Sequence, residues 1–142
     1  MVMVPTGAIS KEVMFGENGV ASTAKPGTVL VDLSSVTPIE SQECYKLAKE
    51  KGLMFLDAPV SGGEPKAVDG TLATMVGGDQ EAFDIAKPVL DAFSSSVLLV
   101  GDSGAGSTAK LVNQIIVNNN IAIVGEAFTF AAKTGVDPVK VY

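Results

Sequence analysis

The sequence predicts an α/β fold with a mostly parallel sheet, followed by a long helix that begins an all-α domain. Two observations support this. Up to about residue 102, short apolar runs rich in β-branched residues alternate with amphipathic helical stretches, as in parallel sheets. After that point one helical pattern continues for about 30 residues. We therefore expect a partial sheet domain over residues 1–102 and an incomplete helical domain over residues 103–142.

The first predicted elements form a strand, a helix and a second strand. Residues 1–4 are apolar, and Pro5 ends this segment. A short helix is expected over residues 8–15, followed by turns rich in glycine and proline. Residues 28–33, with the sequence TVLVDL, then read as a buried strand because the run is apolar and rich in β-branched residues.

The next helix carries clear start signals. Thr37 suits the N-cap, Pro38 the first helical position, and Glu40 completes a capping box. Gly52 ends this helix, and residues 53–57, LMFLD, form the following strand. This order predicts a right-handed crossover between two parallel strands.

The remaining elements lead into the long helix. Residues 59–70 are rich in turn formers, residues 71–76 and 97–100 read as strands, and Asp79 is expected to cap the helix between them. The long helix starts near Gly104 and ends near Gly135. Because it is apolar along much of its length, it needs a covering partner, and we expect a homo-oligomer.

Composition narrows the possible partners and compartments. The chain has 142 residues and a net charge of -6, so nucleic acid is not an expected partner. No unbroken apolar run reaches the ~18 residues of a membrane span, and we expect no membrane partner. The single cysteine, Cys44, suits a reducing compartment such as the cytoplasm. The absence of histidine excludes histidine as a proton donor or metal ligand, and no metal site is expected.

The first candidate site is the stretch DAPVSGG at the end of strand 53–57. The carboxyl end of a strand is where open α/β sheets bind ligands. Ser61 offers a hydroxyl donor, while Gly62 and Gly63 let backbone amides approach a ligand closely, which together suits a carboxylate. The alternative is a flexible turn without a ligand, and the stretch alone does not decide between them.

The second candidate is a polar stripe on the long helix. Lys110, Asn113 and Gln114 have spacings of three and four residues, which place them on one helix face. Burial would lower the pKa of the lysine and make it a proton donor near neutral pH. The alternative is a solvated lysine in the first turns of the helix. The glycine-rich residues 101–106 have GxxGxG spacing, not GxGxxG, and Asp102 would repel phosphate, so direct nucleotide binding is not expected there.

Three segments, VDLSS, DAPVSGGEPKAVDGTLATMVGGD and GAGSTAKLVNQ, in this order and spacing, resemble the β-hydroxyacid dehydrogenase family, which includes 3-hydroxyisobutyrate dehydrogenase. Within the family, the pattern is most similar to the tartronate semialdehyde reductase branch. The resemblance implies the carboxyl-terminal half of a Rossmann-like sheet and a long interdomain helix. It also implies reduction of a small semialdehyde acid to a hydroxyacid with NAD or NADP as cofactor.

The resemblance also implies roles for residues. Lys110 would be the general acid/base, and the substrate would contact Ser61, Gly62, Gly63 and one of the amides Asn113 and Gln114. In many family members the assisting asparagine lies four residues after the lysine, where this chain has Gln114. The cofactor would contact Val4, Pro5 and Ser35 at the strand ends.

The resemblance has limits at both ends of the chain. The family's GxGxxG strand would precede Met1, and most of its helical domain would follow Tyr142. One alternative is therefore a truncated, non-catalytic remnant or oligomeric fragment without complete cofactor binding. Another is a small carboxylate-binding module that uses Ser61, Gly62 and Gly63 without redox chemistry.

Overall fold

The computed structural model describes residues 1–141. The chain divides into two compact units, Met1–Lys110 and Leu111 to the chain end. The first unit holds the whole sheet and is described first.

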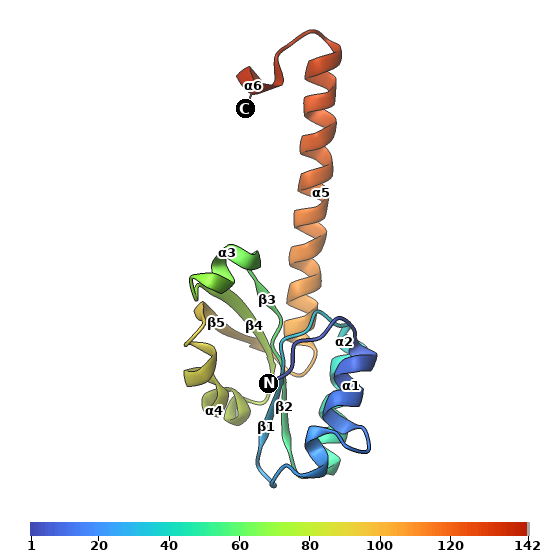
Figure 1. Ribbon diagram of the computed structural model, residues 1–142, viewed down its shortest axis with the longest axis vertical. Helices are drawn as coiled ribbons and strands as arrows, with labels where there is room; N and C mark the ends of the chain where they lie inside the picture. The colour runs from blue at the N-terminus through green and yellow to red at the C-terminus, as the bar shows by residue number, and fades with distance from the viewer. Residues whose placement is uncertain (142) are drawn as a thin grey trace. The chain divides into compact units, whose positions relative to one another are not determined.

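The sheet is mixed and contains five strands (Figure 1). β1 and β2 are parallel, and β4 and β5 are parallel, whereas β4 runs antiparallel to β2 and β3. β2 and β3 follow one another along the same side of β4. The strands are β1 (Val29–Asp32), β2 (Met54–Asp57), β3 (Val60–Ser61), β4 (Leu72–Gly78) and β5 (Ser94–Gly101). The predicted α/β class and the parallel crossover from β1 to β2 are confirmed.

Helices cover both faces of this sheet (Figure 1). α4 packs against one face, and α2, with α1 beside it, covers the other. The helices of the first unit are α1 (Gly7–Phe15), α2 (Pro38–Glu50), α3 (Gly63–Val68) and α4 (Gln80–Leu90), with a 3-10 turn, η1 (Val20–Ser22). The segment 59–70, expected only as turns, therefore contains β3 and α3.

Two hydrophobic cores lie on the two sides of the sheet. Leu30 and Phe55 belong to the core under α1 and α2, while their neighbours Val31 and Leu56 belong to the core under α4. Side chains of a strand alternate between its faces, so a continuous apolar run fills both cores at once. This explains why the β1 and β2 sequences carry no polar alternation.

The α2 capping box forms as predicted. The Thr37 hydroxyl accepts a hydrogen bond from the Glu40 amide at 3.2 Å, and the Glu40 carboxylate accepts one from the Thr37 amide at 2.8 Å. Asp79 is the N-cap residue of α4, as predicted, but the side-chain hydrogen bond expected of a cap is absent. Its carboxylate binds the Tyr45 hydroxyl and the Lys49 ammonium instead.

The second unit is helical. α5 (Ala105–Lys133) begins in the first unit and continues into the second, which confirms the predicted long helix. A short α6 (Pro138–Val141) follows, where Asp137 Oδ1 accepts a hydrogen bond from the Val139 amide. By length and composition α5 is apolar enough to cross a membrane, a test that the core helix of a soluble protein also passes.

Candidate functional site

The carboxyl edge of the parallel strands brings two sequence segments together. Val2 lies beside Asp32 in parallel register, and its amide donates to the Val31 carbonyl at 2.9 Å. Two residues later the Val4 amide donates to Ser34 Oγ, also at 2.9 Å. Val4 is half-buried and Pro5 exposed, and the contact of Val4 with Ser34 joins them to the segment that carries the exposed Ser35. We call this pair of strand ends, residues 4–5 and 34–35, the ledge.

The ledge is supported by a buried carboxylate. Asp32 is 2% exposed, and its two oxygens accept hydrogen bonds from the Ser34 amide and the Ser10 hydroxyl. Through these contacts Asp32 joins the end of β1 to α1 and fixes the turn that presents Ser34 to Val4. Nothing in the sequence pattern alone had singled out Asp32.

The loop after β3 has the conformation that its glycines permit. Ser61 ends β3 and is half-buried, while Gly62 and Gly63 have φ values of 138° and 65°, which side-chain-bearing residues rarely adopt. A Cβ at position 62 would also lie 2.7 Å from the Cβ of Lys66. The turn therefore requires glycine at position 62, in addition to any role of its amide in ligand binding.

A second buried carboxylate lies at the start of α5. Asp57 Oδ1 accepts from the Gly104 amide at 2.7 Å, and Oδ2 accepts from the Ser107 amide at 2.8 Å. Burial raises the pKa of Asp57, and the hydrogen bonds from the amides of Gly104 and Ser107 oppose that rise. This carboxylate occupies the positive end of the helix and takes the amides of Gly104 and Ser107, which disfavours a phosphate there.

Lys110 is the last residue of the first unit and is half-buried on α5. Desolvation lowers its pKa below the ordinary value for lysine. Asn113 and Gln114 belong to the second unit, where both are half-buried and the Asn113 amide nitrogen donates to Gln114 Oε1 at 3.3 Å. The three residues share one helix at spacings of three and four, as the sequence indicates, and their contact with substrate stays a prediction.

Carboxylates lie at the starts of three helices, α1, α2 and α5. Glu40 caps the start of α2, and a Cβ on Gly7, the first residue of α1, would lie 2.4 Å from the same carboxylate. Asp57 fills the start of α5. Among α1, α2 and α5, the helix starts thus already face a carboxylate, which disfavours a pyrophosphate there. The residues of the ledge carry no charged side chain.

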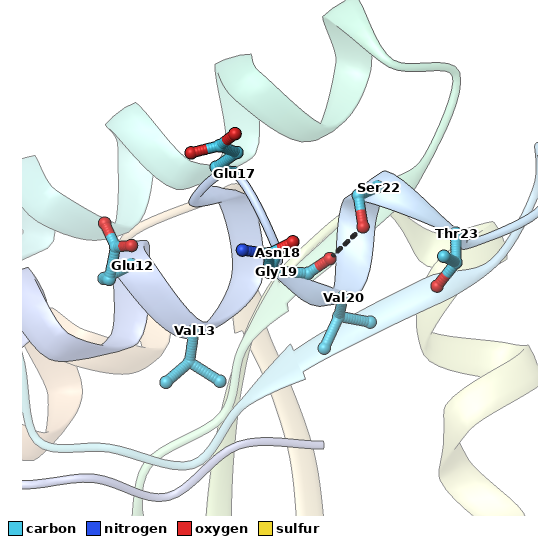
Figure 2. Close-up of a pocket in the computed structure, with 8 residues that line it drawn as sticks. All are labelled: Glu12, Val13, Glu17, Asn18, Gly19, Val20, Ser22 and Thr23. Atoms are coloured by element: carbon cyan, nitrogen blue, oxygen red, sulfur yellow. Dashed lines mark hydrogen bonds between the residues drawn. The ribbon is translucent and has the colours of Figure 1, made fainter.

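A hollow of about 720 Å³ lies elsewhere, beside α1 and η1 (Figure 2). Its eight lining residues are Glu12, Val13, Glu17, Asn18, Gly19, Val20, Ser22 and Thr23. The Ser22 hydroxyl already binds the Gly19 carbonyl at 2.7 Å. The hollow shares no residue with the ledge, the 61–63 loop or the start of α5, and its acidic lining does not suit an acid substrate.

Two family models match the chain. Residues 1–101 match the NAD-binding domain of 6-phosphogluconate dehydrogenase, and residues 104–142 match the NAD-binding model of NADP-dependent 3-hydroxyisobutyrate dehydrogenase. Both models describe domains that bind a nicotinamide dinucleotide.

Known proteins are similar over nearly the whole chain. The 2-hydroxy-3-oxopropionate reductase of Escherichia coli is 47% identical over 99% of this chain, and the 2-(hydroxymethyl)glutarate dehydrogenase of Eubacterium barkeri is 42% identical over 95%. Among solved structures, the 3-hydroxyisobutyrate dehydrogenase of Mycobacterium tuberculosis superposes with a TM-score of 0.88 at 36% identity, covering 95% of this chain and 45% of that one. The chain spans about half the length of the curated relatives, 48% of the first and 45% of the second.

Proposed function

The chain belongs to the 3-hydroxyisobutyrate dehydrogenase-related family of NAD(P)-dependent oxidoreductases, and from this we propose that it serves the reduction of a small semialdehyde acid to a hydroxyacid. The proposed substrate is 2-hydroxy-3-oxopropionate (tartronate semialdehyde), and the product is glycerate. The high identity to a 2-hydroxy-3-oxopropionate reductase supports this choice over other hydroxyacids.

The proposal rests on the burial of the Lys110 side chain and its lowered pKa. Its side chain is half-buried, and desolvation lowers its pKa, which brings the ammonium group closer to giving up its proton at neutral pH. In the proposed step a hydride adds to the aldehyde carbon, and the Lys110 ammonium gives its proton to the oxygen. The positive charge of the ammonium also stabilises the negative charge that develops on that oxygen.

The other residues hold the substrate. We assign the carboxylate to the Ser61 hydroxyl and to the backbone amides of Gly62 and Gly63, two consecutive residues with positive φ values that follow β3. One of the amides Asn113 and Gln114 would contact the reacting end of the substrate. These groups orient the aldehyde carbon, and a correctly held geometry is itself a large part of the catalysis.

The ledge would hold the cofactor. The nicotinamide, when bound, supplies the hydride to the aldehyde carbon. Val4 and Pro5 provide an apolar surface, and the exposed Ser35 hydroxyl provides a hydrogen-bond partner. We further propose that the protein works as a homo-oligomer, since α5 exposes large apolar side chains along residues 111–130. We also propose that it works in the cytoplasm, because the single Cys44 suits a reducing compartment.

The test is oxidation of NADH or NADPH by the chain with tartronate semialdehyde. Lys110→Ala should lower turnover by ~10²–10⁴-fold, the usual contribution of a general acid. Lys133→Ala is the matched control, because Lys133 lies on the same helix but is exposed in its last turn, and it should keep the parent rate. Reduction needs the ammonium form, so the rate should fall on the alkaline side at a lower pH than an ordinary lysine would give.

Other outcomes would replace this proposal. Equal turnover of Lys110→Ala and the parent chain would remove the lysine from the mechanism. No turnover and no calorimetric binding of either nucleotide would favour a non-catalytic chain. Binding of glycerate without nucleotide, lost in Ser61→Ala, would favour a simple carboxylate-binding module.

A further inference from the structure

We infer that Asp57 is a positioning residue for Lys110: its buried carboxylate fixes the first turn of α5 and thereby sets where the lysine ammonium lies. The inference rests on the function proposed for Lys110 and deepens it. It concerns a residue that touches neither substrate nor cofactor and acts through the helix.

The carboxylate of Asp57 holds two different points of the helix start. Asp57 is 1% exposed, and its two oxygens bind the amides of Gly104 and Ser107 at 2.7 and 2.8 Å. Because each oxygen has its own donor, the pair restrains both the height of the helix above the strand end and its rotation about its axis. A single hydrogen bond would leave that rotation free.

Close backbone contact with β2 and β4 also holds the first turn of α5. A Cβ on Gly106 would lie 2.5 Å from the carbonyl oxygens of Asp57 and Met75, so only glycine lets the helix approach the strands this closely. The Ser107 hydroxyl lies 2.8 Å from the Ser41 hydroxyl, which adds a tie to α2. The first turn of α5 is thus packed on β2 and β4 and bonded to α2.

Lys110 follows this turn on the same side of the helix. It comes four residues after Gly106 and three after Ser107, the spacings that place residues on one face. Helical Cα–Cβ bonds tilt toward the N-terminus, so the aliphatic stem of Lys110 begins above the docked turn. Any shift or rotation of that turn is therefore passed directly to the ammonium.

Asp32 provides a matched control. It is also a buried carboxylate at the carboxyl end of a parallel strand, 2% exposed, but its partners are Ser10 and Ser34, and it does not hold α5. Asp57→Asn and Asp32→Asn remove the same charge from equivalent places. If Asp57 only supports general stability, the two variants should have the same effects on Lys110.

The experiment uses the 142-residue chain with lysines labelled at Cε with ¹³C, and the Lys110 resonance is assigned by its loss in Lys110→Arg. Asp57→Asn should shift this resonance and speed hydrogen exchange of the amides of residues 104–110 on the order of tenfold relative to those of β1 and β2. Gly106→Ala, which changes no charge, should give the same signature. Asp32→Asn should leave the Lys110 resonance in place.

Kinetics provide a second readout on the same variants. Asp57→Asn should lower kcat on the order of 10–100-fold with little change in KM for the acid, since misplacing a catalytic group slows the chemical step. Asp32→Asn should act mainly on KM for the nicotinamide cofactor, through the ledge.

The inference is overturned if Asp57→Asn keeps the parent resonance and exchange rates, or if Asp32→Asn reproduces its effects on Lys110. If Asp57→Asn does not fold, hydrogen exchange of the parent chain is the test. Fast exchange of the Gly104 and Ser107 amides would contradict the anchoring contacts. Full activity of Lys110→Ala would end the proposed function but would leave these exchange results unchanged, so the two failures are distinguishable.

Discussion

The two units of this chain contain similar apolar residues but bury them very differently. In the first unit, Phe55 is 1% exposed between the sheet and α2, whereas Phe130 on α5 in the second unit is 71% exposed. The sheet of the first unit has helices on both faces, so the apolar residues of β1 and β2 meet a second layer. Apolar composition therefore stabilises a segment only where another element covers it.

Truncation of one phenylalanine in each unit gives the largest expected difference. Phe55→Ala should lower the free energy of unfolding by ~3–5 kcal/mol, because it opens a cavity in a closed core. In the single chain Phe130→Ala removes an exposed ring and should change this free energy by less than about 0.5 kcal/mol, whereas in the proposed homo-oligomer, where a second copy would cover α5, the loss should be larger. Urea unfolding followed by circular dichroism measures both. Similar losses in the two variants at concentrations where the chain is monomeric would contradict the difference in burial between the units.

Two glycines of α5 test the same contrast within one helix. Gly106→Ala should cost ~1–3 kcal/mol, since the new methyl group would overlap strand carbonyls. Gly125 has no heavy atom within 4 Å of the position its Cβ would take, so Gly125→Ala should instead favour the helix by about 0.5–1 kcal/mol. Urea midpoints and the helical signal at 222 nm report these changes. A stabilising Gly106→Ala would contradict the close docking of α5 on the strands.

Sequence reasoning worked where the signals are local. The start of α2 was predictable because Thr37, Pro38 and Glu40 satisfy the helix start among themselves. The β1 and β2 strands were predictable because their apolar runs are short and rich in β-branched residues or bounded by turn formers. The length of α5 followed from its uninterrupted helical pattern.

The structural features that the sequence did not indicate depend on contacts between residues far apart in the chain. Asp79 resembles an N-cap, but Tyr45 and Lys49, more than 25 residues away in the chain, take its carboxylate. The antiparallel direction of β4 depends on its pairing with β2 and β3, which no local motif encodes. The anchoring role of Asp57 depends on Gly104 and Ser107, 47 and 50 residues later. An acidic strand end followed by a glycine-rich helix start is the signal that could have suggested it.

The smallest expected effect on stability comes from the ion pair between Asp79 and Lys49 in the first unit, whose contribution depends on pH. The Lys49 ammonium and the Tyr45 hydroxyl lower the pKa of Asp79, so its contribution to stability is fully present above the ordinary carboxyl pKa of about 3.9. That contribution is lost as the pH falls through the lowered value. The contribution of Asp57 to stability depends on pH in the opposite direction. Burial raises its pKa, so ionisation of Asp57 reduces stability as the pH rises.

Asp79→Asn should therefore destabilise the chain at pH 7 by only ~0.2–1 kcal/mol, because the pair is largely exposed to solvent. The gap between variant and parent should be smaller at pH 3, below the ordinary carboxyl pKa of about 3.9, because the carboxyl of the unfolded chain then takes up a proton and the ion pair no longer favours folding to the same extent. Urea unfolding at both pH values measures the gap, with Glu126→Gln on the exposed second unit as the charge-matched control. A gap of equal size at pH 3 would mean that the Asp79 side chain stabilises the first unit through packing and not through its charge.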